Sequence, residues 1–97
     1  MQPNEIPNME PVTVELSQPI QAHGETIHQL TIHPPKVKHL KMMDAVKGDT
    51  QKTIVLVSAL ANIPQSSVEE VTGFDTAQKI APVISNFLGA SQETGEN

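Results

Sequence analysis

The longest apolar run in the chain, DTQKTIVLVSALANI at 49–63, constrains the fold more than any other stretch. Ser58 and Asn62 are the only polar interruptions in its second half. Such a run is either a buried strand or a helix that is apolar on most of its faces. Its β-branched residues favour a strand, whereas its length, its alanines and the Gly-Asp-Thr start at 48–50 favour a helix. We expect a helix over 50–62, around which the other elements pack.

The residues before this run predict a β-hairpin. Residues 12–16 alternate apolar and polar side chains, which is typical of a half-buried strand, and Pro19 either ends this strand or restricts it to a sheet edge. Gly24 supplies a turn with positive φ, and 26–33 forms a second strand with a bulge near His28. A lone hairpin is barely stable in water, so it must pack on the helices or pair with another chain.

Helices are expected after the hairpin, which gives a segregated α+β fold. Gly48 is expected to close the first helix as a left-handed C-terminal residue. Asp75 is expected to cap the last helix, and Pro82 to kink or divide it. The predicted single domain spans 11–88, with the hairpin at 12–33 and helices at about 36–47, 50–62, 65–71 and 75–88.

The chain has 97 residues, which fits one domain, and its polar ends, 1–10 and the acidic 89–97, are expected to be flexible tails. A domain this small, with an aliphatic core, gains stability if oligomerisation or a partner supplies further burial, so a homo-oligomer is one expectation. The absence of cysteine excludes disulfides, Cys-based zinc sites and thiol nucleophiles. With no signal peptide and no run long enough for a membrane span, we expect a soluble cytoplasmic protein.

The net charge of −5 is unevenly distributed along the chain. Five of the six lysines lie within 36–52, where only Asp44 and Asp49 oppose them. The chain has no arginine, and its only aromatic residues are Phe74 and Phe87, so nucleic-acid binding is not expected. A solvated helix face is the expected interpretation of the lysines, and contact with an acidic partner surface is the next.

The sequence contains no recognisable catalytic or metal-binding constellation. None of the four histidines has a carboxylate or a second histidine at ligand spacing, although His39 among lysines could act as a pH-sensitive charge. Glu69-Glu70 and Asp75 fit a helix surface and a cap better than an acid pair. The serines and threonines lack a nucleophile motif, and the isolated glycines form no phosphate-binding loop. We therefore expect no enzymatic activity, no cofactor and no metal site.

Apolar residues that a helix cannot bury are the candidates for partner binding. The first predicted helix has apolar residues at helical spacing, Val37 and Leu40 among them, which predicts a buried face. The adjacent Met42 and Met43 cannot both face the same core, so one should be exposed, and methionine adapts to irregular partners. Phe87-Leu88 would form a docking site if the pair were exposed. Plain core packing, with one methionine at the surface, is the favoured interpretation of these residues, and partner binding is the alternative. The candidate partner-binding residues are Leu40, Met42, Met43, Phe87 and Leu88.

The order of these motifs over 12–89 resembles the tail assembly chaperones of contractile-tailed, Mu-like bacteriophages, of the tail protein E type. The matching features are VTVELSQPIQAHGETIHQLTIHPP, a helix that starts with KVKHL, the alanine- and leucine-rich central run, Ile63-Pro64 with SSVEEV, and GFDTAQKIAPVISNFLG. Two features depart from the family pattern. The first helix often carries an acidic residue near the position of the basic-flanked His39, and Pro82 is unusual in a closing helix.

The resemblance implies a non-enzymatic chaperone that binds the tape measure protein, keeps it soluble and helps to recruit tail tube subunits. It implies that the protein acts in the host cytoplasm and is absent from the mature virion. It also implies a longer product, made by a programmed frameshift near the end of the gene. Residues 86–88 could be encoded AAT TTT TTG, which contains the run of T that such a shift uses. The alternatives are a structural tail or baseplate protein that remains in the virion, and a small regulatory module that binds another protein.

Overall fold

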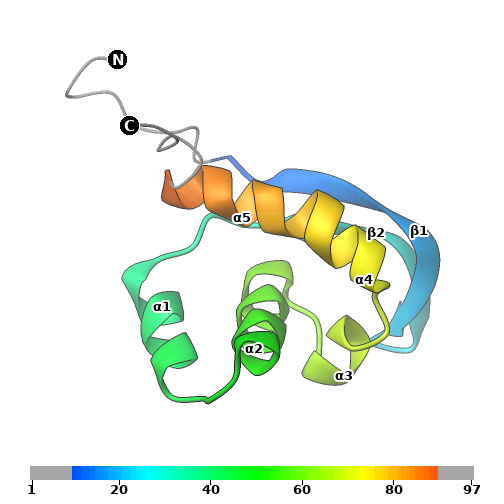
Figure 1. Cartoon of the computed structure of the whole chain (residues 1–97). Helices are drawn as coiled ribbons and strands as arrows, with labels where there is room; N and C mark the ends of the chain where they lie inside the picture. Colours follow the sequence, from blue (N-terminus) through cyan, green and yellow to red (C-terminus); the bar gives the residue numbers. More distant parts are fainter. Residues whose placement is uncertain (1–9, 90–97) are drawn as a thin grey trace.

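The structure, a computed structural model, describes residues 10–89, so most of the two predicted tails lies outside the described residues. A hairpin is followed by helices, which confirms the predicted α+β class (Figure 1). The last three helical segments run into one another, and we call them together the closing helix. The elements are β1 (Val12–Ala22), β2 (Glu25–Ile32), α1 (Val37–Asp44), α2 (Asp49–Ala61), α3 (Gln65–Val68), α4 (Gly73–Asp75), the π-helical η1 (Thr76–Ile80) and α5 (Ala81–Leu88).

The hairpin is antiparallel, and both residues of its two-residue turn have positive φ, 55° at His23 and 75° at Gly24. The predicted bulge near His28 is present, but the extra residues lie in the other strand. Glu15 pairs with Gln29 and Ile20 pairs with Ile27, so the irregular segment of β1 between Glu15 and Ile20 lies opposite His28. The apolar pattern in β2 indicated the position of the register shift but not that β1 carries the extra residues.

Pro19 explains why β1 tolerates this bulge. Proline has no N–H to donate to a ladder, and Pro19 lies inside the irregular segment, where no ladder bond is needed. β1 therefore continues to Ala22, so the expectation that Pro19 ends the strand is wrong. The alternative, an edge strand, holds, because each strand of a two-stranded sheet is an edge.

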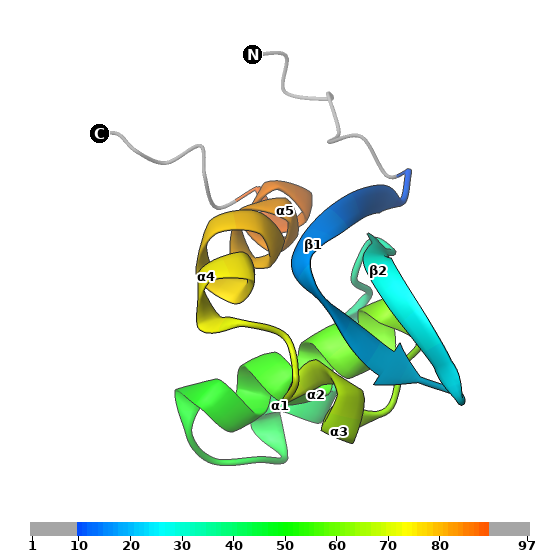
Figure 2. The same ribbon diagram turned by 90° about the vertical axis from the view of Figure 1, so that its right-hand side faces the viewer.

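The bulge of β1 is tied to the closing helix by the carboxylate of Asp75, which is fully buried. The backbone N–H of Ser17 donates to Oδ2 of Asp75 at 2.8 Å, and the Ser17 hydroxyl donates to Oδ1 at 2.6 Å. Lys79 Nζ donates to the Glu15 carbonyl at 3.0 Å and lies 3.5 Å from Oδ1 of Asp75. The closing helix accordingly runs along β1 in both views (Figures 1 and 2).

The prediction that Asp75 caps the last helix is wrong. Thr72 is the N-cap, because its side-chain Oγ1 accepts a hydrogen bond at 3.0 Å from the backbone N–H of Asp75, and the helix begins at Gly73. The carboxylate of Asp75 instead accepts the two hydrogen bonds from Ser17 described above. Pro82 lies inside the closing helix, directly after the π turn, in which the Ala81 N–H bonds to the Thr76 carbonyl five residues back. The change in hydrogen bonding therefore falls next to the residue that has no N–H to donate.

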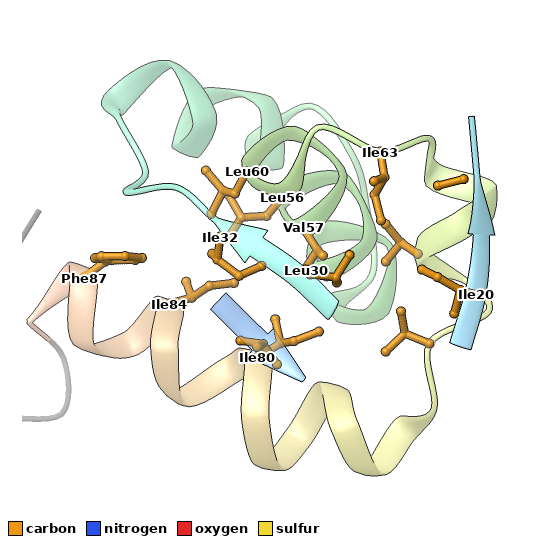
Figure 3. Close-up of a cluster of buried hydrophobic side chains, with 14 residues drawn as sticks. Ile20, Leu30, Ile32, Leu56, Val57, Leu60, Ile63, Ile80, Ile84 and Phe87 are labelled. Carbon is orange, nitrogen blue, oxygen red and sulfur yellow. The ribbon is translucent and has the colours of Figure 1, made fainter. Parts of the chain in front are cut away.

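The core lies between α2, the hairpin and the closing helix (Figure 3). The prediction of a central helix is confirmed, and the strand alternative for this run is excluded. The Leu60 carbonyl of α2 also accepts the His33 N–H at 3.0 Å, which joins the end of β2 to α2. The labelled core side chains are Ile20, Leu30 and Ile32 from the hairpin, Leu56, Val57, Leu60 and Ile63 from α2 and its end, and Ile80, Ile84 and Phe87 from the closing helix.

The junction between α1 and α2 differs from the prediction. Gly48 has φ 88° and ψ 134°, which is not a left-handed helical conformation, and it occupies the N-cap position of α2. Ala45 is the C-cap of α1, and its backbone N–H bonds to the carbonyls of Met42 and Met43. Lys52 of α2 also donates through Nζ to the Met43 carbonyl in the last turn of α1, at 3.2 Å, and to the Val46 carbonyl in the loop after α1, at 3.0 Å. A cation at a helix C-terminus is favourable, so Lys52 stabilises this end of α1.

Candidate functional site

Helix α1 lies beside α2 at the periphery of the molecule (Figure 1), and none of its residues is buried. Val37 is 79% exposed and Leu40 is 39% exposed, so the prediction that they form a buried face is wrong. The reason is that α1 has one neighbouring helix, α2, and turns Met43 toward the core. Val37, Leu40 and Met42 remain exposed within residues 10–89, and exposed apolar side chains grouped in this way are typical of an interaction surface.

The structure places the five candidate residues in three different environments. Leu40 and Met42, which is 42% exposed, lie on the surface of α1, while Met43 is partly buried against the core. The expectation that one of the two adjacent methionines is exposed is therefore confirmed. Phe87 belongs to the core and Leu88 is 48% exposed, so this end of the closing helix offers one apolar side chain rather than a pair. The role of the five in partner binding stays a prediction.

A groove of about 670 Å³ lies where the start of α1 meets the end of β2 and the end of α2, and we call it the α1 groove. Its wall combines apolar side chains with two lysines and two histidines. Within residues 10–89 this wall contains no carboxylate. The lining residues are Pro11, His33, Pro34, Pro35, Lys36, Lys38, His39, Ala59 and Leu60.

His39 adds a polar ring but little charge to the α1 groove. Its Nδ1 accepts a hydrogen bond from the backbone N–H of Lys36 at 2.8 Å, which requires Nδ1 to be unprotonated. Partial burial, followed by the positive charges of Lys38 and Lys36, lowers the pKa of His39 below the ordinary histidine value of 6.5. The ring is therefore neutral at pH 7, and the positive charge of the groove comes from its two lysines.

A second groove, of about 460 Å³, lies between α2, α3 and the closing helix. It contains Glu69 and no lysine, so its charge is opposite to that of the α1 groove. Phe74, at the start of the closing helix, is 64% exposed next to Gly73 of this wall. The remaining lining residues are Thr50, Thr53, Ile54, Val68, Val71, Thr76, Ala77 and Ala81.

The polar residues considered for chemistry serve structural roles. In the part of the chain that the structure describes, no group of three His, Cys, Asp or Glu residues could hold a metal ion. Glu70 Oε1 accepts the backbone N–H of Gln21 at 3.2 Å, and His23 Nε2 lies 3.2 Å from the carbonyl of Asn62. The hydroxyl of Ser17 holds the pKa of Asp75 below its ordinary value, so this buried carboxylate stays ionised and cannot act as a general acid.

Sequence reasoning missed three features of this surface: the exposure of Val37, the position of Lys36 and Lys38 in a groove wall, and the exposure of Phe74. A Pro-Pro pair directly before the lysines was a signal that they follow a sharp stop at the end of a strand. No local signal would have shown that Phe74 is exposed.

None of the helices described between residues 10 and 89 is long and apolar enough to cross a membrane.

The chain was compared with known protein families, curated proteins and solved structures. Neither the curated proteins nor the solved structures give a match. A family model does match, over residues 13–78, which run from β1 into η1 and make up more than half of the chain. Its description is "phage tail assembly chaperone proteins, E, or 41 or 14", a non-enzymatic class that acts during assembly. The sequence resemblance is thus confirmed, and the chain belongs to this family of phage tail assembly chaperones.

Proposed function

We propose that the chain binds the tape measure protein in the host cytoplasm, keeps it soluble and helps to recruit tail tube subunits during tail assembly. The observation that carries the proposal is the family match over 13–78. A tail assembly chaperone needs tail proteins as partners, and the tape measure protein is the long helical component that must be kept from aggregating. The chaperone leaves before the particle is complete.

The surface of α1 supports this proposal on physical grounds. Val37, Leu40 and Met42 expose apolar side chains on one short helix, and Lys38 and Lys41 alternate with them. Such a helix can cover apolar turns of a partner helix while its lysines stay in water. Methionine adapts to partners of irregular shape, which suits a chaperone that meets many different stretches of one long protein.

Co-expression with the tape measure protein tests the proposal. The wild-type chain should move the tape measure protein from the pellet to the soluble fraction and elute with it on size exclusion. The variant Val37→Glu/Met42→Glu should lose this effect, because charges replace the two most exposed apolar side chains of α1. The matched control Val12→Glu/Phe74→Glu removes exposed apolar surface elsewhere and should keep the effect. An insoluble tape measure protein in the presence of the wild-type chain would contradict the proposal.

Mass spectrometry of purified virions gives an independent test. An assembly chaperone should be absent from the finished particle. A fixed copy number in the particle would instead make the chain a structural tail or baseplate protein. A stable complex with a host protein, combined with no affinity for the tape measure protein, would make it a regulatory module.

A further inference from the structure

We infer that the α1 groove binds a peptide segment in which carboxylates flank apolar side chains, as on an acidic amphipathic helix. The inference deepens the proposed function and rests on it for the identity of the protein that carries this segment. Three properties of the groove support this inference: its apolar wall, the two lysines in that wall and its size.

The apolar part of the wall is rigid and poor in hydrogen-bond donors. Pro11, Pro34 and Pro35 contribute rings without backbone N–H groups, and Ala59 adds a methyl group from the end of α2. The bond from the His33 N–H to the Leu60 carbonyl, 3.0 Å long, fixes the two sides of the groove to each other. A preformed apolar wall favours apolar side chains, because little conformational entropy is lost when they bind.

The two lysines of the wall favour a bound segment that has carboxylates next to its apolar side chains. Lys36 and Lys38 are exposed, and the residues that line the groove within the described range 10–89 include no carboxylate. The wall of the groove itself is therefore positively charged. In about 0.15 M salt, charges act over about 8 Å, so a bound segment is attracted by these two lysines despite the net charge of −5. The second groove, with Glu69 in its wall, would repel the same segment.

The size of the groove limits the occupant to one face of a peptide. Its volume of about 670 Å³ is in the range of sites that enclose a compact ligand, about 300–1,000 Å³. A few apolar side chains fill such a space, and the carboxylates next to them then lie at the lysine rim. Val37 and Leu40 extend the apolar surface beyond the groove along α1.

Two synthetic helical peptides test the inference. They share one face of leucine and alanine, and their flanking positions are all Glu in one peptide and all Lys in the other. Their affinity for the full chain is measured by fluorescence anisotropy at low and at high salt. The Glu peptide should bind about tenfold more tightly, because each exposed ion pair changes affinity by a factor of about 1.4 to 5 and the Lys peptide is repelled. High salt should reduce this difference.

Charge-reversal variants locate the effect. Lys36→Glu/Lys38→Glu should abolish or invert the preference for the Glu peptide. Lys41→Glu/Lys47→Glu makes the same change in net charge outside the groove wall and should keep most of the preference. Lys36→Gln/Lys38→Gln should lose the preference without inverting it, and far-UV circular dichroism verifies that each variant is folded. Equal affinity of the wild-type chain for both peptides, or equal effects of the two charge-reversal variants, would overturn the inference.

The proposed function and the peptide specificity of the α1 groove can be contradicted independently of each other. If the wild-type chain and Lys36→Glu/Lys38→Glu both keep the tape measure protein soluble, the groove does not hold this segment and the proposed function still stands. If the peptides are discriminated as expected while the wild-type chain leaves the tape measure protein insoluble, the groove specificity holds and its natural partner is a different protein.

Discussion

Replacing Ser17 by alanine should destabilise the domain, although Ser17 itself is exposed. The change removes the 2.6 Å bond from the Ser17 hydroxyl to the buried carboxylate of Asp75. A hydrogen bond to a charged group contributes about 1.5–3 kcal/mol. The lower end applies, because one partner is exposed and the Ser17 N–H still donates to Asp75 at 2.8 Å. We expect a loss of about 1.5 kcal/mol, which lowers the melting temperature of a domain of this size by about 6–12 °C.

The effect of this substitution should depend on pH. The Ser17 hydroxyl has the largest influence on the pKa of Asp75 and lowers it below the ordinary aspartate value of 3.8, despite the opposing effect of burial. The Ser17 N–H, Thr72 and Lys79 lower this pKa further. A carboxylate with a lowered pKa in the folded state adds stability above its unfolded pKa. That stability is lost as the pH falls through the folded pKa. The gap between wild type and Ser17→Ala should therefore be full at neutral pH and shrink below about pH 4.

Urea unfolding followed by far-UV circular dichroism at neutral and acidic pH measures both effects, since the chain lacks tryptophan. Ser66→Ala, at an exposed serine of α3, is the matched control and should stay close to wild type. The reasoning is refuted if Ser17→Ala is as stable as Ser66→Ala at neutral pH. It is also refuted if the gap to wild type does not shrink in acid, because Asp75 would then not be the acceptor that matters.

Three further predictions concern the core, α1 and the gene. Leu60 is 1% exposed, and replacing it by alanine should lower the free energy of unfolding by about 2–5 kcal/mol. A variant as stable as wild type in urea would contradict the central position of α2. The pKa of His39 in an NMR titration should lie below 6.5, so stability falls as the pH drops through this pKa; a higher value would contradict the bond from the Lys36 N–H. The coding DNA over 86–88 should contain a T-rich slippery heptamer with an overlapping downstream frame, and its absence would make the frameshift prediction wrong.

Local patterns were sufficient to predict the class and order of the elements. Alternation at 12–16 and Gly24 predict the hairpin, and the run at 49–63 predicts the central helix, because these signals depend on neighbours within a few residues. The errors concern long-range contacts. Asp75 has the sequence context of a cap, yet its partner is Ser17, 58 positions away. No local pattern indicates a carboxylate that satisfies the donors of a distant bulge.

The candidate site was predictable in part for the same reason. Adjacent methionines cannot share one face of a helix, so the exposure of Met42 follows from helical geometry alone. The α1 groove, in contrast, combines Pro11 with the end of β2, the start of α1 and Ala59, which together span about half of the chain. Val37 was expected in the core because it has helical spacing, but spacing identifies an apolar face and does not show whether the chain provides a surface to cover it.

The attachment of α1 has a consequence for the dynamics of the domain. α1 has 8 residues and none of them is buried, whereas isolated helices shorter than about 12–15 residues are marginal in water. It is held by α2 and by the Lys52 ammonium, which donates to the Met43 carbonyl in its last turn and to the Val46 carbonyl in the loop that follows. α1 should therefore behave as a separate foldon, whose amides exchange with solvent through sub-global opening at a lower free energy than those of α2. If α1 binds the tape measure protein as proposed, a helix that detaches while the core stays folded can change its angle from one turn of that long partner to the next.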